Sequence, residues 1–246
     1  VHEKTLSNRQ INKQLIIVNS FFGWLYQHEY IVKNPAHHLL VQKDKKARDQ
    51  DERSAYTPDE IKTILDKTKH LHGAKKYVPM IACYSGLRLN EACQLLVTDL
   101  ITVDGIVCFD INDRAENSRL KTASSARIIP VHPRLIKNGL LKYLEAVKSS
   151  GSERLFPELS YHSTNGYGQS FTKWFSVFNR ENITKDPLKS FHSVRHSVAN
   201  ELKQSGVTVE LLAELLGHRV ESISMSRYGK KYRPEPLLEA IKKLPW

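Results

Sequence analysis

Residue types suited to phosphodiester chemistry occur in two distant parts of the chain. Arg88 lies in the segment Ser85–Glu91, and the last third holds His192, Arg195, His218 and Tyr228. A guanidinium can grip two phosphate oxygens at once, a histidine exchanges protons near neutral pH, and a tyrosine oxygen is a nucleophile. Together these residue types indicate covalent chemistry on a phosphodiester.

The charge balance indicates a polyanionic partner. The 246 residues carry a formal net charge of +11, with a sequence pI near 9.5. Nucleic acid is the favoured partner, because no compact polybasic tail stands beside an amphipathic anchor, as a membrane-surface protein would need. The apolar run at 15–25 is broken by Asn19, Ser20 and Gly23 and is too short to span a bilayer. No signal peptide is visible.

The cysteine pattern excludes two architectures. Cys83, Cys93 and Cys108 are odd in number and lack C-x-x-C spacing. Neither a disulfide framework nor a zinc ribbon is therefore indicated, and a reducing cytoplasm is the simplest location.

The hydrophobic pattern predicts two domains. Ile11, Leu15, Val18, Phe22 and Leu25 follow the spacing of an amphipathic helix. A mixed-charge run at 43–53 has no large apolar residue and is interpreted as an exposed linker, with a solvated helix as the alternative. We expect a first helical domain at 1–45, a linker at 46–55 and a second domain at 56–246. The chain begins at Val1 instead of Met, so the first domain is expected to be truncated.

The second domain is expected to be mainly α with a small antiparallel β-sheet, an α+β fold. Thr57, Pro58 and Glu60 form a capping box for a helix through about Lys69, and Gly86 ends the next helix. A third helix is expected near 88–96. Asp104-Gly105 between two apolar runs predicts a hairpin over 100–103 and 106–111, followed by a strand at 127–131. Helices and loops occupy the rest, with a C-terminal helix at 237–244.

Local spacing gives each candidate residue both a chemical and an ordinary interpretation. Arg88 is expected in the first turn of its helix, where free N–H groups favour an anion, with Glu91 on the same face to orient the guanidinium. The alternative is a surface Arg–Glu pair. His192 and Arg195 share one face of a helix capped by Ser190, against the alternative of scattered surface charges.

Three histidines raise the possibility of a metal site. His192 and His196 are four residues apart and could face one ion, with His218 as a third ligand. Arg195 lies between them, however, and no glutamate follows His192 as in H-E-x-x-H, so a metal is not favoured. His218 follows a helix-ending Gly217, and Tyr228 lies in a basic segment that also contains Tyr232.

The order of these pieces resembles the active site of the tyrosine recombinases, the phage integrase family. The resemblance covers most of 54–232: Ser85-Gly86-Leu87-Arg88-x-x-Glu91, Ser190-Phe191-His192-Ser193-Val194-Arg195-His196, Leu215-Leu216-Gly217-His218, Leu155-Phe156-Pro157 and Phe171-Thr172-Lys173-Trp174-Phe175. It implies a catalytic set of Arg88, Lys121, His192, Arg195, His218 and Tyr228, with Glu91 in support. Lys121 enters only through the resemblance, as a lysine before the third strand. Tyr228 is preferred to Tyr232 because Arg227-Tyr228-Gly229 fits the family better.

The resemblance also implies an activity and partners. A relative of this kind would be a site-specific recombinase of a phage or mobile element, cleaving double-stranded DNA through a 3′-phosphotyrosine without metal, ATP or other cofactor. It would act as a homotetramer, with a pair of protomers on each site, alone or with DNA-bending proteins, in a bacterial cytoplasm. Residues 1–45 would close a core-binding domain, and the C-terminal helix would dock in cis or on a neighbour. The alternatives are a type IB topoisomerase-like enzyme and a DNA-binding protein with an inactive recombinase domain.

Overall fold

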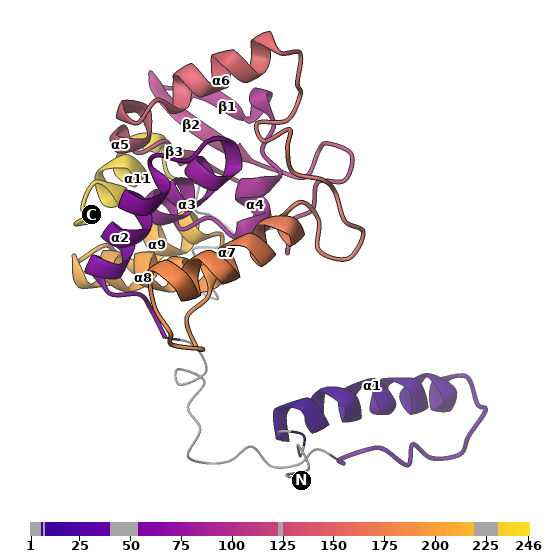
Figure 1. The fold of residues 1–246 in the computed structure, drawn as a ribbon. Helices are drawn as coiled ribbons and strands as arrows, with labels where there is room; N and C mark the ends of the chain where they lie inside the picture. Colours follow the sequence, from indigo (N-terminus) through magenta and orange to yellow (C-terminus); the bar gives the residue numbers. More distant parts are fainter. Residues whose placement is uncertain (1–5, 7, 40–53, 123–124, 219–230) are drawn as a thin grey trace. The chain divides into compact units, whose positions relative to one another are not determined.

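The computed structural model describes residues 6, 8–39, 54–122, 125–218 and 231–246. The chain divides into two compact units, Val1–Glu52 and Arg53–Trp246 (Figure 1). Of the sequence-predicted linker at 46–55, only residues 54 and 55 are among those described. Within the described residues, no helix combines the length and apolarity that crossing a bilayer requires.

The first unit is built on one long helix, α1 (Asn8–Gln27). Its half-buried apolar residues include Ile11, Leu15, Phe22 and Leu25, so the expected helical stripe is confirmed except for the exposed Val18. The chain then turns back along the helix, because the Asn34 side-chain amide donates to Asn19 Oδ1 at 2.9 Å.

The second unit begins with two helices whose ends the sequence specifies. In α2 (Pro58–Thr68), the Thr57 side chain accepts from the Glu60 N–H while the Glu60 carboxylate accepts from the Thr57 N–H, which confirms the capping box. The next helix, α3 (Gly73–Ser85), ends at Gly86, whose φ of 65° is the left-handed conformation that glycine adopts without strain. Ten of its thirteen residues are buried, so α3 runs through the core.

A three-stranded antiparallel sheet lies beside these helices, in the order β1 (Leu100–Val103), β2 (Ile106–Ile111) and β3 (Arg127–Pro130). Asp104 and Gly105 both have positive φ, as a type I′ hairpin turn requires. The hairpin and the third strand are therefore confirmed. Residues 112–126 connect β2 to β3 and carry Lys121.

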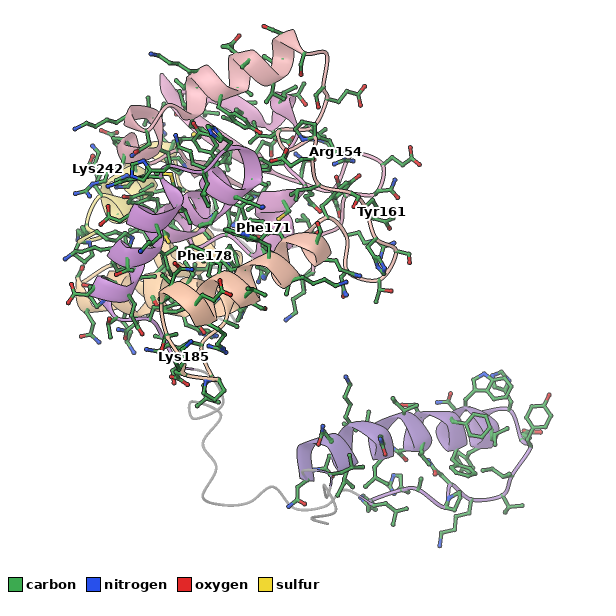
Figure 2. The ribbon with its side chains drawn as sticks, viewed as in Figure 1. Arg154, Tyr161, Phe171, Phe178, Lys185 and Lys242 are labelled. Carbon is green, nitrogen blue, oxygen red and sulfur yellow. The ribbon has the colours of Figure 1, made fainter. Side chains whose placement is uncertain are left out.

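The remaining elements complete a mostly helical domain (Figure 1). The aromatic rings of Phe175 and Phe191 lie 4.9 Å apart and join α7 to α8; Figure 2 shows Phe171 and Phe178 on the same α7. The elements are α4 (Leu89–Cys93), the short 3-10 helix η2 (Val97–Asp99), α5 (Pro133–Lys137), α6 (Leu140–Ser149), α7 (Gly168–Asn182), α8 (Phe191–Gln204), α9 (Val209–Leu216) and α11 (Pro234–Ile241). The predicted α+β class is confirmed.

Two predicted helices have different bounds. The one expected over 88–96 is only α4, because Gln94 caps it and Leu96 is already extended, with its N–H bonded to the Asp99 carboxylate at 2.8 Å. The C-terminal helix starts at Pro234 instead of 237 and ends at Ile241. It packs on β3 and α9 of its own chain, burying Leu237 and Ile241.

Candidate active site

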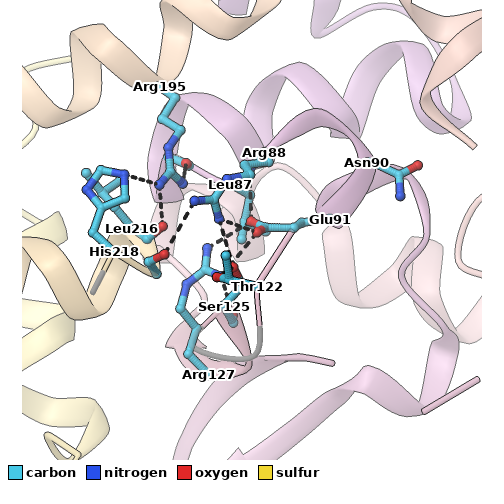
Figure 3. A network of polar contacts seen from close by, with 12 residues as sticks. Leu87, Arg88, Asn90, Glu91, Thr122, Ser125, Arg127, Arg195, Leu216 and His218 are labelled. Atoms are coloured by element: carbon cyan, nitrogen blue, oxygen red, sulfur yellow. Dashed lines mark hydrogen bonds and ion pairs between the residues drawn. The ribbon is translucent and has the colours of Figure 1, made fainter. Parts of the chain in front are cut away.

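Five elements meet where four of the predicted site residues, Arg88, Glu91, Arg195 and His218, lie together (Figure 3). Gly86 ends α3, Arg88 is the N-cap of α4, Arg127 opens β3, Arg195 lies in α8 near its start, and Gly217 ends α9. Because helix and strand ends expose backbone carbonyls, several acceptors for arginine are available here.

Arg88 and Glu91 form a largely buried pair. The Arg88 Nη1 donates to Glu91 Oε1 at 2.7 Å, and the Arg88 N–H donates to Glu91 Oε2 at 3.0 Å. The Arg88 side chain is 19% exposed and that of Glu91 only 3%. The surface-pair alternative is therefore wrong, and Glu91 fixes the guanidinium of Arg88 at the helix start.

Arg127 is a site residue that the sequence analysis missed. Its side chain is 2% exposed, and it donates to Glu91 Oε2 at 2.9 Å, to Ser125 O at 2.6 Å and to Leu215 O at 2.9 Å. The sequence did contain an indication of its burial. Residues two apart on a strand lie on the same face of the sheet, so Arg127 is expected on the same face as the buried Ile129. An arginine on a core face needs a buried anion, which is Glu91.

The two arginines share the Glu91 carboxylate and hold it ionised. Burial acts to raise the pKa of Glu91, but the charge and hydrogen bond of Arg127 and the bonds from Arg88 outweigh it. The net effect is a Glu91 pKa below its ordinary value. Glu91 is therefore an anion that orients two cations.

Arg195 is held by the ends of two helices. Its Nη1 donates to Gly86 O at 2.9 Å, and its Nη2 donates to Leu216 O and lies 2.9 Å from His218 Nε2. Burial, and after it the neighbouring Arg88, lower the pKa of Arg195 to about 9. Arg195 remains a cation at neutral pH but gains from any added anion.

His218 lies at the end of α9 with its backbone N–H bonded to Ala213 O at 2.8 Å. Burial first, then the charges of Arg195, Arg88 and other cations, lower its pKa below the ordinary value. The imidazole is therefore neutral at pH 7. Since an arginine only donates, the Nε2 beside Arg195 is the unprotonated nitrogen.

The structure describes the positions of Lys121 and His192 but not that of Tyr228. Lys121 is exposed on the β2–β3 connection, near enough for its charge to lower the His218 pKa. His192 is half-buried at the start of α8, with its ring edge-on to His196 at 4.9 Å. Tyr228 lies outside the described residues. Tyr232 is described, and its N–H donates to the Glu214 carboxylate at 3.0 Å.

The histidines do not form the metal site considered above. In the part of the chain that the structure describes, no group of three His, Cys, Asp or Glu side chains is arranged to hold an ion. His218 lies against Arg195, a cation that would repel a metal there. The cluster contains three arginines, Arg88, Arg127 and Arg195, around one carboxylate, which suits an anion.

Comparisons with known proteins give the family. The model of the phage integrase family matches residues 55–233. A tyrosine recombinase of Thermosipho africanus is 23% identical over 95% of this chain and 75% of its own length. A XerC-like tyrosine recombinase of Caldanaerobacter subterraneus subsp. tengcongensis is 25% identical over 93% of the chain, which spans only 64% of that relative.

Solved structures agree on the fold. The Tn1549 transposon integrase, in complex with transposon right-end DNA, superposes with a TM-score of 0.61 at 20% identity, covering 93% of this chain and 77% of that one. A lambda integrase dimer bound to a core site gives 0.58 at 17% identity, covering 92% and 76%. The fold is that of a tyrosine recombinase catalytic domain.

The chain belongs to the phage integrase family, and its enzyme class is tyrosine recombinase. The resemblance found in the sequence is thereby confirmed, while the roles of its individual residues remain predictions.

Proposed function

We propose that this chain cleaves and rejoins double-stranded DNA at specific sites, as the recombinase of a phage or other mobile element. The observation that carries the proposal is the pair of arginines held at two helix ends around a neutral histidine. Arg88 Nη2 donates to Gly217 O at 3.3 Å, and Arg195 Nη1 donates to Gly86 O at 2.9 Å. A scissile phosphate between these two guanidiniums would meet a preorganised cationic site.

The cleavage step transfers a phosphodiester from DNA to the protein. The Tyr228 oxygen attacks the phosphorus, the bond from phosphorus to the 5′ oxygen breaks, and a 3′-phosphotyrosine remains. His192 assists loss of the tyrosine proton, and Lys121 gives a proton to the leaving 5′ oxygen. Attack by a free 5′ hydroxyl on the phosphotyrosine reverses these changes and rejoins a strand.

The cationic cluster supports the charge changes of this step. Arg88 and Arg195 hold the non-bridging oxygens and His218 hydrogen-bonds one of them, while Glu91 and Arg127 keep Arg88 in place. Because arginines supply the charge that a divalent ion supplies in other phosphoryl-transfer enzymes, the scheme calls for neither metal nor ATP. A bound phosphate also adds the anion that the buried Arg195 lacks.

The domain roles and partners belong to the same proposal. Residues 1–45 act as part of a core-binding domain, 46–55 as its linker, and 56–246 as the catalytic domain. Two solved relatives were determined on DNA, one of them as a dimer on its core site. By analogy, pairs of protomers occupy each site and two pairs form a tetramer, with or without DNA-bending proteins.

The test uses supercoiled plasmid carrying candidate target DNA, with chelator present. Wild type is expected to give SDS-resistant protein–DNA adducts, and Tyr228→Phe to abolish them. Tyr232→Phe is the matched control and should retain them. Adducts lost only with Tyr232→Phe would reassign the nucleophile, and activity that requires a particular divalent ion would overturn the metal-free scheme.

The assay also separates the rival functions. Recombinant products alongside adducts support site-specific exchange. Relaxation of the plasmid with adducts but without recombinants would instead indicate a topoisomerase-like enzyme. DNA binding without adducts and without relaxation would indicate an inactive recombinase domain.

A further inference from the structure

Gln94 is a buried amide that the proposed chemistry leaves without a role. It caps the C-terminal end of α4, the helix that Arg88 begins, and is 4% exposed. Its Nε2 donates to Asn112 O at 3.2 Å, while its Oε1 accepts from Asn90 Nδ2 at 2.8 Å and from the Arg119 N–H at 3.0 Å. Both ends of the carboxamide are therefore used, a pattern that a carboxylate or an apolar side chain cannot reproduce.

These bonds hold the connection that carries Lys121. Asn112 and Arg119 both lie between β2 and β3, so Gln94 binds this connection at its start and again two residues before Lys121. A second group, Arg154, bridges the same elements, donating to Gln94 O at 3.3 Å and to Glu116 O at 3.0 Å.

The Arg119 side chain anchors the connection on the outside. Its Nη1 donates to Ser163 O at 3.0 Å and its Nη2 lies 2.7 Å from the Tyr161 hydroxyl. Figure 2 shows Tyr161 and Arg154 on the same part of the domain. The end of the loop at 161–167 is in turn held against α4, because the N–H of Gly168, the first residue of α7, donates to Asn90 Oδ1 at 3.2 Å.

A further anchor follows Lys121 on its other side. The Ser125 N–H donates to Thr122 O at 2.9 Å, and Ser125, which is fully buried, lies with its Oγ 3.4 Å from Arg88 Nη1. Lys121 therefore lies between two anchors, one to Gln94, the C-cap of α4, and one to Arg88, the N-cap of the same helix. One short helix fixes the connection from both of its ends.

We infer that Gln94, with Arg119, is a positioning residue that sets where Lys121 delivers its proton relative to the phosphate held by Arg88. The inference rests on the proposed function, in which Lys121 protonates the leaving oxygen. Lys121 is itself exposed, so its reach depends on where the backbone of the connection is held. Loss of the Gln94 bonds would move the proton donor and leave Arg88 bound to Glu91.

The test compares oxygen with sulfur as the leaving atom. The cleavage position is mapped from the covalent adduct, and duplexes are made with oxygen or sulfur at the bridging 5′ position of that phosphate. A thiolate leaves without being protonated, so the sulfur substrate does not need Lys121. Rates of adduct formation are measured in a single turnover at protein concentrations that saturate the DNA for every variant, which removes differences in DNA affinity.

On the oxygen substrate, Lys121→Ala is expected to lose roughly 100-fold or more in rate, as for loss of a general acid. Gln94→Met, similar in volume but without the amide, is expected to lose about 10- to 100-fold, as for a displaced catalytic group. On the sulfur substrate both should return towards wild type. Gln94→Met combined with Lys121→Ala should be no slower than Lys121→Ala alone, because the two changes remove one function.

Asn179→Leu is the matched control, since Asn179 is a buried amide (1% exposed) on α7 that bonds Tyr56 and Lys189 instead of the connection. Whatever rate Asn179→Leu shows on the oxygen substrate, the sulfur substrate should not bring that rate closer to the wild-type rate. If Gln94→Met does not fold, Arg119→Ala tests the same point through an exposed side chain, with a smaller loss that sulfur again rescues.

Two results would overturn the inference, and they differ from each other. Equal loss by Gln94→Met on both substrates would mean that Gln94 does not act through Lys121. Failure of sulfur to rescue Lys121→Ala would instead remove the proton-donor role of Lys121 from the proposed function.

Discussion

Arg127 shows how one buried side chain can organise a site without contacting the reacting atoms. It neutralises Glu91 beside Arg88 and also binds Leu215 O near the end of α9, the helix that His218 follows. The side chain therefore links the two halves of the cluster. Its guanidinium is also close to Gly217, where an added Cβ would lie 2.8 Å from Arg127 Nη1.

We predict that Arg127→Met lowers the free energy of unfolding by about 3 to 5 kcal/mol, because it leaves a buried carboxylate with one cation fewer. Urea unfolding measures the loss. Lys148→Met is the control, since it breaks an exposed pair with Glu145 in which the side chains are 44% and 69% exposed. That change should cost less than about 1 kcal/mol. Equal losses in the two variants would contradict the buried role of Arg127.

His132 makes stability depend on pH. It is buried against Tyr84, with ring centroids 4.5 Å apart, and its Nδ1 accepts from the Arg134 N–H at 3.1 Å. Burial, then the charges of Arg134 and Lys242, lower its pKa from 6.5 to about 4. The folded state therefore keeps the imidazole neutral, while the unfolded chain takes up a proton below about pH 6.5.

The contribution of His132 is complete above about pH 6.5 and is lost as the pH falls towards 4, by on the order of 3 kcal/mol. We predict that the difference in unfolding free energy between wild type and His132→Gln shrinks over this window and is constant above it. Denaturant titrations at several pH values measure that difference. A difference that stays constant down to pH 4 would refute the assignment.

Residues were predictable from the sequence where their partners are local. Arg88 and Glu91 are three positions apart, so their pairing follows from helix geometry. Arg127 lies 36 positions from Glu91 and 88 from Leu215, and only the tertiary fold brings these groups together. Gln94 was missed for the same reason, since Asn112, Arg119 and Arg154 reach it from outside its helix.

At the scale of elements, helix ends position the arginines. Gly86 combines a left-handed φ with a close contact, because an added Cβ would lie 2.7 Å from Leu216 Cδ2 and 3.2 Å from Val198 Cγ1. The end of α3 is therefore packed directly onto α8 and α9, which hold Arg195 and precede His218.

We predict that Gly86→Ala destabilises the protein more than Gly206→Ala. Both glycines have left-handed φ, 65° and 75°, but nothing lies within 4 Å of a Cβ at Gly206. Gly206→Ala should cost about 1 to 2 kcal/mol from backbone strain, and Gly86→Ala a further 1 to 3 kcal/mol or so from overpacking. Chemical denaturation of the two variants gives the comparison; equal costs would mean that the helix ends are not tightly packed.

The same elements define the limits of sequence-based prediction. Caps and turns such as Thr57, Gly86 and Asp104-Gly105 are local signals, and the structure confirms each one. Helix lengths were less predictable. The end of α4 depends on Gln94 bonding to Asn112 in the β2–β3 connection and on Asp99 accepting from the Leu96 N–H, and the apolar spacing of Leu89, Ala92 and Leu95 gave no sign of either bond.

For the whole molecule, the division into two units has a simple consequence. The second unit contains the large hydrophobic core, from Tyr56 to Trp246, so it holds what a stable domain requires. The proposed linker lies before it, and the run at 43–53 contains Lys43, Lys45, Lys46, Arg48 and Arg53.

We predict that brief digestion with trypsin cuts first within 43–53. The fragment from about residue 54 onward should keep a cooperative thermal unfolding transition close to that of the intact chain. Mass spectrometry identifies the cut, and calorimetry of the purified fragment measures the transition. First cuts inside the second unit, or a fragment without a transition, would contradict the proposed domain boundary.

Besides the Glu91 carboxylate that holds Arg88, the two arginines are held by three backbone carbonyls, those of Gly86, Leu216 and Gly217. A point mutation replaces a side chain and leaves a carbonyl in place, so no single codon change can delete these acceptors directly. Genetic inactivation of the carbonyl contacts must therefore pass through the arginines, through Glu91 and Arg127, which keep Arg88 in place, or through the glycines that set the helix ends. The carbonyl contacts of Arg88 and Arg195 therefore tolerate most substitutions. Random mutagenesis should find the loss-of-function changes that affect them concentrated at those few codons.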